Sequence, residues 1–119
     1  MYRGEFSAEF LAGKRRYAGI AKLIQGEVDR VLENPYNSEL LTKKRSDLRG
    51  HRSVRVTRNF RIVFVVCEEC IQRDFRSKGY PDCASVCTKT LPSRDIVFVA
   101  VGQHERVYDE RPRFDTVGV

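Results

Sequence analysis

The segment "SVRVTRNFRIVFVV", residues 53–66, decides the fold class. Its first half alternates valines with polar residues, and this period of two predicts a strand with one buried face and Arg55 on the other face. Arg58 and Asn59 indicate a tight turn, because asparagine tolerates positive φ. Phe60–Cys67 is apolar on both faces, which predicts a central strand. The segment therefore predicts two neighbouring strands that form the middle of a sheet.

Upstream of this segment the pattern is helical. Tyr2–Phe6 is a short strand candidate, and Ser7 follows with a hydroxyl that can accept hydrogen bonds from the exposed N–H groups of a helix start. A helix is expected over Ala8–Tyr17. Apolar residues then recur at helical spacing and predict an amphipathic helix over Ile20–Glu33, which Asn34-Pro35 ends.

Three further segments complete the order of elements. Tyr36–Gly50 is polar and basic, and is interpreted as a loop with a short helical turn around Glu39–Lys43. Glu68–Ser93 has no clear period and is interpreted as an inserted loop. Arg94–Gly102 predicts a third core strand. This order indicates an α+β fold, with two helices packed on one sheet.

Length and composition indicate one ordered globular domain. The chain has 119 residues, of which 41% are hydrophobic and 32% are charged, and such a length allows one modest core. The longest apolar runs, Ile62–Cys67 and Ile96–Val101, are far shorter than the roughly 20 residues that cross a bilayer. No apolar segment follows a basic N-terminal one, so no signal peptide is expected and the protein is predicted to be cytoplasmic.

The positive charge is concentrated in one stretch. The chain carries a formal net charge of +6, and the stretch from Lys43 to Arg61 holds eight basic residues against a single acid, Asp47. A solvated face normally mixes signs, whereas a stripe of one sign on a nearly neutral body favours a polyanion or an acidic protein as partner.

Three motifs in order resemble the RelE/ParE superfamily of type II toxins, in its RelE-like branch. They are "VLENPY" (31–36), "DLRGHRSVRVTRNFRIVF" (47–64) and "IVFVAVGQHERVY" (96–108). The resemblance covers Tyr2 to Tyr108, so that residues 68–93 form a cysteine-bearing insertion in a single domain over residues 1–119. It implies two N-terminal helices packed on a small, mostly antiparallel sheet.

The resemblance also implies one of two activities. RelE-like members are endoribonucleases, or mRNA interferases, that cleave mRNA in the ribosomal A site and need no cofactor for catalysis. ParE-like members inhibit DNA gyrase and lack the catalytic residues, and this is the alternative. Either activity implies a cognate antitoxin protein as partner; the first adds the ribosome and mRNA, and neither involves a membrane.

Four catalytic candidates are carried over from the resemblance. The strand that bears basic residues two apart in RelE-like toxins has Ser53 and Arg55 here, so one of the two is lost. The arginine after the aromatic of the next strand is Arg61. The basic residue two places past the glycine is His104, and the following aromatic is Tyr108.

These residue types suit metal-free RNA cleavage. Arg55 and Arg61 would hold the phosphate oxygens and stabilise the developing charge. His104 titrates near neutral pH and would act as acid or base, and Tyr108 would stack on a base or orient the nucleophile. Other basic residues are predicted to contact RNA phosphates nonspecifically: Lys43, Lys44, Arg45, Arg49, Arg52 and Arg58.

Structural interpretations of the same residues stay open. Arg61 could pair with an acid such as Glu105, His104 could cap or pack at the strand end, and Tyr108 could belong to the core. His51, in "RGHR", is interpreted as a surface turn residue rather than a second acid–base group.

The four cysteines have the spacing C-x2-C-x12-C-x3-C. They are Cys67, Cys70, Cys83 and Cys87. Two close pairs joined by a loop suit tetrahedral zinc, and four thiolates would close the coordination shell, so that the site would be structural. Unligated thiols, disulfides and an iron–sulfur cluster are the alternatives.

Overall fold

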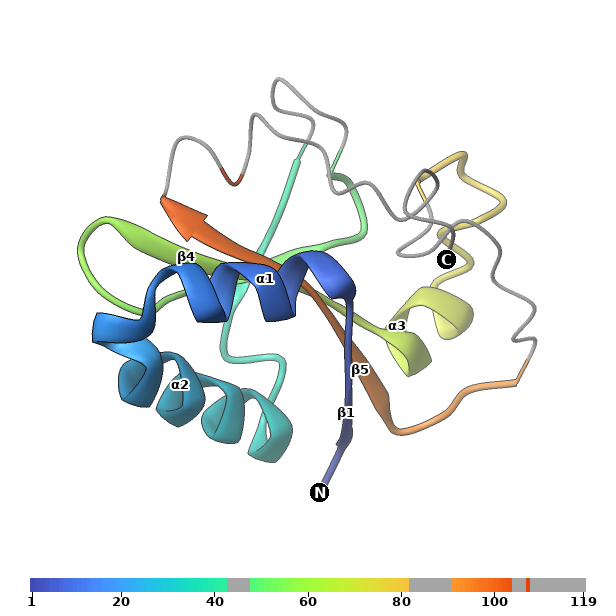
Figure 1. Ribbon diagram of the computed structural model, residues 1–119. Coiled ribbons are helices and arrows are strands. Elements are labelled where there is room, and N and C mark those ends of the chain that lie inside the picture. The colour runs from blue at the N-terminus through green and yellow to red at the C-terminus, as the bar shows by residue number, and fades with distance from the viewer. Residues whose placement is uncertain (43–47, 82–90, 104–106, 108–119) are drawn as a thin grey trace.

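A computed structural model describes residues 1–42, 48–81, 91–103 and 107 (Figure 1). Among these residues five strands form a single sheet in the order β1-β5-β4-β3-β2. The strands are β1 (Arg3–Phe6), β2 (Glu39–Leu40), β3 (Arg52–Arg55), β4 (Phe60–Val66) and β5 (Asp95–Gln103). β1 runs parallel to β5 and the other pairs are antiparallel. The prediction of a mostly antiparallel sheet with Phe60–Cys67 at its centre is confirmed.

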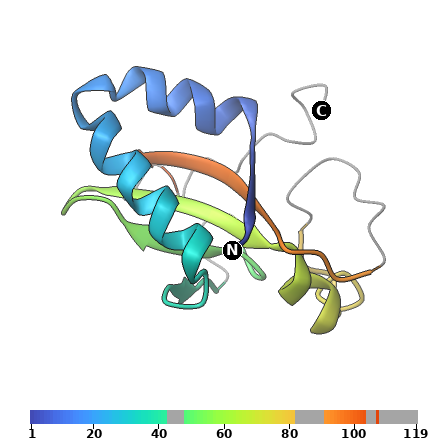
Figure 2. The ribbon, with the colours of Figure 1, turned by 90° about the horizontal axis from the view of Figure 1, so that it is seen from below.

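Two N-terminal helices cover one face of this sheet, as predicted (Figure 2). α1 spans Ala8–Arg16, a 3-10 turn spans Ala18–Ile20, and α2 spans Ala21–Glu33. Their apolar sides meet the sheet in one core cluster, which buries Phe10, Ile24, Val28, Val31, Ile62, Phe64, Val66, Ile96 and Phe98. The fold class is therefore α+β, with α1 and α2 on one face of the sheet.

Ser7 caps α1 as its sequence position predicted. Its Oγ accepts from the backbone N–H of Phe10 at 2.9 Å and donates to the carbonyl of Val99 at 2.6 Å. The register between β4 and β5 shifts between Val63 and Phe64, so that Val99 stands without a direct partner on β4. The cap thus joins the start of α1 to an irregular point of β5.

A second core cluster fills the opposite face of the sheet. It buries Val63 and Val65 of β4 and Val99 of β5 beneath Leu41, Leu48 and Val107. Both faces of β4 are buried in this way, which is why its sequence is apolar at successive positions.

Two local predictions were wrong. The helical turn expected around residues 39–43 is instead the strand β2, where Glu39 pairs with Ser53 and Leu40 with Arg52. The segment after β4 was expected to be a loop, but it begins with a helix, α3, spanning Cys67–Gln72. Long-range pairing with β3 explains the first difference, and α3 is too short for a clear period to show in the sequence.

No helix in the described part of the chain is long and apolar enough to span a membrane.

Candidate functional site

Arg55, Arg61 and Gly102 form a row across three strands. Arg55 of β3 lies directly opposite Arg61 of β4, and Arg61 lies directly opposite Gly102 of β5. Their neighbours Val54 and Ile62 pack into the core beneath the helices. Because side chains alternate along a strand, both arginines project from the other face of the sheet. The structure therefore brings the two predicted phosphate ligands together.

The surroundings of the row leave the arginines accessible. Arg55 is exposed and Arg61 is half-buried. The Nη1 of Arg61 lies 3.4 Å from the carbonyl of Thr57, at the long limit of a hydrogen bond. Gly102 adds no side chain beside Arg61, and within the described residues a Cβ there would meet only Val107, at 3.7 Å.

The electrostatics of the row favour an anion. Two like charges placed directly opposite on neighbouring strands destabilise a sheet. Arg55 and Arg61 are such a pair. A phosphate held between the guanidinium groups would relieve their repulsion and would receive several N–H donors in fixed geometry.

Ser53 lies two residues before Arg55 on β3, at the position where RelE-like toxins carry a second basic residue. The residue pairs with Val63 and is only 3% exposed. An arginine or lysine there would have to bury its charge, which is costly without a partner. On this face of β3, Arg55 is therefore the basic residue that can reach an anion, and the buried position of Ser53 does not suit a second one.

Arg52 does not fit its predicted role as an RNA contact. It is 9% exposed. Its guanidinium binds the carboxylate of Glu69 on α3, from Nε at 2.9 Å and Nη2 at 2.7 Å, and donates from Nη1 to the carbonyl of Ser38 at 3.2 Å. The side chain also lies over the ring of Tyr36. Arg52 thus joins β3 to α3 inside the protein.

The two other described RNA-contact candidates lie on turns. Arg58 is exposed in the bend between β3 and β4. Arg49 lies in the turn before β3, where its guanidinium is 4.9 Å from the ring centroid of Tyr80. Both positions are compatible with contact to a polyanion.

His51 is buried, contrary to its interpretation as a surface turn residue. It is 2% exposed, its backbone N–H donates to the carbonyl of Leu48 at 3.0 Å, and its carbonyl accepts from the N–H of Leu41 at 2.8 Å. The backbone therefore does form a turn, but the side chain points into the protein.

A polar cluster beside α3 centres on Glu68. The hydroxyl groups of Tyr2 and Tyr36 both donate to Glu68 Oε1, the latter at 2.8 Å, and the guanidinium of Arg94 lies 4.2 Å from the Tyr2 ring centroid. The hydrogen bond from Tyr2 lowers the pKa of Glu68, although burial opposes this effect. Burial and the bond to Glu68 raise the pKa of both tyrosines. The cluster joins α3 to the residue before β1 and to the segment after α2.

Cys67 and Cys70 lie three residues apart on α3. This spacing places both thiols on one side of the helix. Cys67 is buried, and Cys70 packs against the second core cluster. The geometry suits two ligands of one metal, but within the part of the chain that the structure describes no group of three or more potential ligands comes together.

Seven predicted site residues lie outside the described residues. They are Lys43, Lys44, Arg45, Cys83, Cys87, His104 and Tyr108.

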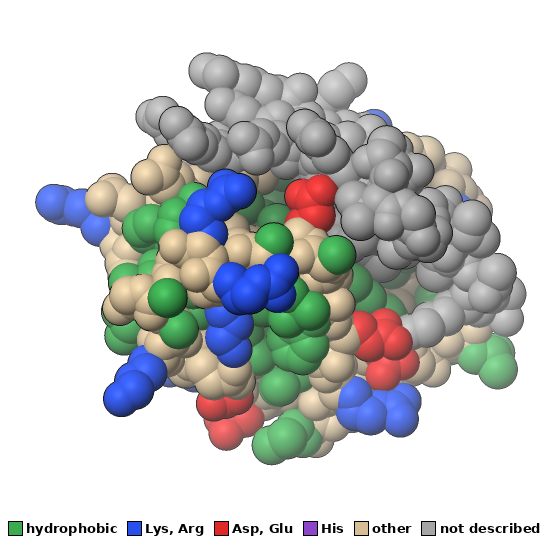
Figure 3. Space-filling view, in the orientation of Figure 1, with side chains coloured by type: hydrophobic (Ala, Val, Ile, Leu, Met, Phe, Trp, Pro, Cys, Tyr) green, Lys and Arg blue, Asp and Glu red, His purple; other side chains and the backbone are tan. Residues whose placement is uncertain are grey.

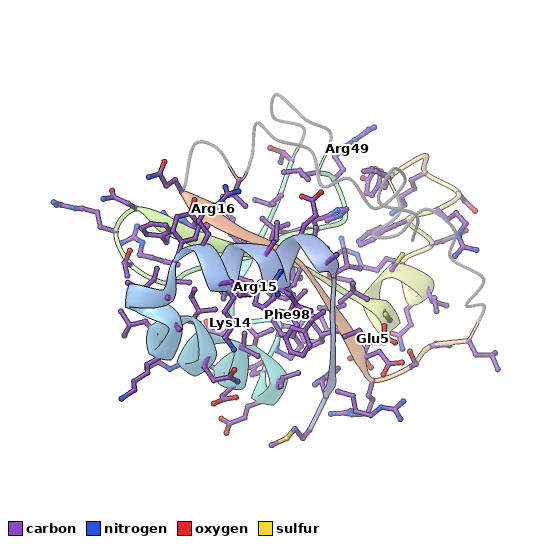
Figure 4. All side chains as sticks on the ribbon, in the orientation of Figure 1. Glu5, Lys14, Arg15, Arg16, Arg49 and Phe98 are labelled. Atoms are coloured by element: carbon purple, nitrogen blue, oxygen red, sulfur yellow. The ribbon has the colours of Figure 1, made fainter. Side chains whose placement is uncertain are left out.

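Basic residues outside the stripe were missed by the sequence analysis. Lys14, Arg15 and Arg16 form the last turn of α1, and Figure 3 shows cationic side chains gathered over this helix. Figure 4 labels them on α1, on the helical side of the sheet. A second group lies in "RDFRSKGY", residues 73–80, where three basic residues are interspersed with two aromatic ones. That mixture of basic and aromatic residues is a signal for nucleic-acid contact that the sequence does contain.

No protein-family model, curated protein or solved structure matches this chain.

Proposed function

We propose that this protein is the toxin of a type II toxin–antitoxin system, and that it cleaves mRNA on the ribosome by attack of the ribose 2′-hydroxyl. Two observations support this proposal. The chain resembles RelE-like toxins in three ordered motifs. Its fold, with two N-terminal helices on one face of a mostly antiparallel sheet, is the one that the resemblance predicted.

The observation that carries the proposal is the pair of Arg55 and Arg61. Evolution of a stable sheet alone would not favour two arginines directly opposite each other, since the pair is destabilising in the absence of an anion. A phosphodiester would supply the missing negative charge. As its phosphorus becomes pentavalent it gains charge, and preorganised cationic donors stabilise this state more than the ground state.

Proton transfer completes the proposed reaction. The 2′-oxygen attacks the phosphorus while its proton goes to a base, the bond from phosphorus to the 5′-oxygen breaks, and that oxygen receives a proton from an acid. The upstream RNA then ends in a 2′,3′-cyclic phosphate. His104 is proposed as the acid or base, and Tyr108 as the residue that stacks on a base or orients the 2′-hydroxyl.

The proposed partners are the ribosome with its mRNA and a cognate antitoxin. Arg49 and Arg58 are exposed or half-exposed near the ends of β3 and would add phosphate contacts. An antitoxin would silence the toxin by covering this cationic face.

Mapping mRNA ends on translating ribosomes tests the proposal. The wild type should cut in the A site, Arg61→Ala should lower the rate by about 10²- to 10³-fold, and His104→Ala by about 10²- to 10⁴-fold. Arg15→Ala is the matched control, because it also removes one arginine but lies on α1, on the helical side of the sheet and away from the row. It should change the rate little.

A second assay separates the proposal from its main rival. A gyrase inhibitor of the same fold would cut no mRNA and would block DNA supercoiling. If the wild type blocks supercoiling and produces no A-site cuts, the nuclease proposal is wrong. If it does neither but binds RNA, the protein is a non-catalytic RNA-binding relative, and the proposal is wrong as well.

A structural zinc ion held by Cys67, Cys70, Cys83 and Cys87 is also proposed. The placement of Cys67 and Cys70 on one side of α3 supports it. Elemental analysis of the purified protein should find about one zinc per chain. Less than about half an equivalent, with all thiols titratable, would remove the closed four-thiolate site.

A further inference from the structure

The segment that follows α3 has a preformed shape. Residues 73–80, here called the basic turn, are closed by backbone hydrogen bonds from Phe75 to Cys70 at 3.0 Å, from Lys78 to Phe75 at 3.1 Å and from Tyr80 to Phe75 at 3.2 Å. Gly79 adopts φ = 78°, a left-handed conformation that favours glycine. These bonds hold the backbone of the basic turn in a single shape.

Aromatic rings anchor the basic turn to the sheet. Phe75 is 3% exposed, and its ring centroid lies 5.1 Å from that of Tyr80. Both rings pack on Gly50, in the turn before β3, where a Cβ would come within 3.1 Å of Phe75 and 3.2 Å of Tyr80. Gly50 also has φ = 87°. Any larger residue there would push the basic turn away.

Cations surround these rings. Arg49 lies over Tyr80 at 4.9 Å, and Arg73 and Lys78 lie over Phe75 at 5.2 and 5.6 Å. The turn also exposes Arg76. Its one carboxylate, on Asp74, accepts a hydrogen bond from Ser77 Oγ at 2.8 Å. The surface is therefore cationic, with aromatic rings beneath the charges.

The basic turn and the arginine row belong to the same side of the sheet. Cys70 and Leu48, which flank the turn and its anchor in the chain, pack in the core cluster on the face opposite the helices. Arg49 and Arg55 lie before and at the end of β3, at most about 20 Å apart at roughly 3.3 Å per residue. Figure 4 shows Arg49 extending outward from the turn before β3.

We propose that the basic turn, together with Arg49, is a second RNA-contact surface that binds the backbone of the strand held at the arginine row. The inference rests on the proposed function in taking RNA as the ligand, but not on cleavage. Guanidinium groups held over aromatic rings suit single-stranded RNA, because phosphates bind the charges while bases stack on the guanidinium planes. An acidic peptide would be bound by the positive charges alone and would not use stacking surfaces.

The test is the salt dependence of binding to a single-stranded RNA of about 20 nucleotides, enough to span several contacts. The probe carries 2′-O-methyl groups, so it cannot be cleaved. The variant Arg76→Gln/Lys78→Gln removes two exposed charges. In a plot of the logarithm of the binding constant against the logarithm of the salt concentration, each phosphate contact adds about 0.7 to the steepness of the slope for a single strand. Loss of two contacts should therefore make the slope less steep by about 1.4. Between about 50 and 200 mM salt the wild type should then lose about sevenfold more affinity than the variant.

The matched control is Arg15→Gln/Arg16→Gln, which removes the same charge from the exposed end of α1, on the helical side of the sheet. It should leave the slope close to that of the wild type. An unchanged slope in the Arg76→Gln/Lys78→Gln variant overturns the inference. So does an equal loss in the α1 variant, because the effect would then be one of net charge. Absence of mRNA cleavage would refute the proposed function but leave this measurement valid.

Discussion

Arg52 and Glu69 form a buried, two-bonded ion pair between β3 and α3. The distances are 2.9 Å from Nε to Oε1 and 2.7 Å from Nη2 to Oε2. Only 11% and 4% of the two side chains are exposed. Glu69→Ala would leave the guanidinium buried without its counter-charge, so the free energy of unfolding should fall by about 3–5 kcal/mol. Urea unfolding of the wild type and of Glu69→Ala measures this change.

A surface ion pair provides the control for this prediction. Glu27 accepts from Arg30 at 2.6 Å on α2, but the Arg30 side chain is 79% exposed. Glu27→Ala should change the free energy of unfolding by less than about 1 kcal/mol. If both variants lose the same free energy of unfolding, burial does not make the Arg52–Glu69 pair more important for stability, and the prediction is wrong.

Tyr2 should make stability depend on alkaline pH. Burial raises the pKa of its hydroxyl in the folded protein, with a further contribution from its bond to Glu68. Since the unfolded tyrosine ionises near pH 10, the stabilising contribution is complete below about pH 10 and is lost as pH rises toward the folded pKa. Tyr2→Phe removes this component. The difference between wild-type and variant unfolding free energies should therefore shrink as the pH rises above about 10, and a constant difference would contradict the assignment.

Two helical glycines should respond to alanine with opposite signs. A Cβ at Gly13 on α1 would lie 2.5 Å from the carbonyl oxygen of Val101, so Gly13→Ala should destabilise the fold by about 1–3 kcal/mol. Beyond its chain neighbours and the backbone of its own helix, no described atom lies within 4 Å of a Cβ at Gly26 on α2. Gly26→Ala should stabilise the fold by up to about 1 kcal/mol, because alanine favours helices. Thermal unfolding of both variants checks the two signs.

The arginine row should lower the stability of the folded protein while favouring RNA binding. Arg55→Gln removes the repulsion with Arg61 and should raise the free energy of unfolding by about 0.2–1 kcal/mol at low salt, while weakening RNA binding. The gain should fade at high salt because ions screen the repulsion. Arg58→Gln, in the exposed bend, should change stability by less than about 0.5 kcal/mol. A loss of stability in Arg55→Gln would mean that the arginine pair is not strained.

The elements that sequence predicted well are those with a strong local period. The apolar spacing of residues 20–33 and the capping hydroxyl of Ser7 predicted α2 and the start of α1 to within a residue or so. The alternation and apolar run of residues 53–66 predicted β3 and β4. β2 and α3 were missed because two strand residues and six helical residues are too few for a period to appear.

The candidate site divides in the same way. Motif order singled out Arg55 and Arg61, and the sheet register then set them face to face. Sequence assigned Arg52 to RNA contact and did not reveal that this side chain is buried. The position of Glu69, brought close only by folding, makes Arg52 an internal ion-pair partner.

By itself, the sequence determined the order of helices and strands, the central place of β4 and the cationic character of the chain, because these follow from local spacing and composition. Only the tertiary structure decided which arginines reach solvent and which rings they cover. Tyr80 meets Arg49 over Gly50 across a long separation in the chain. The energy of a charged side chain depends on its burial and its nearest partner, and both are properties of the folded chain.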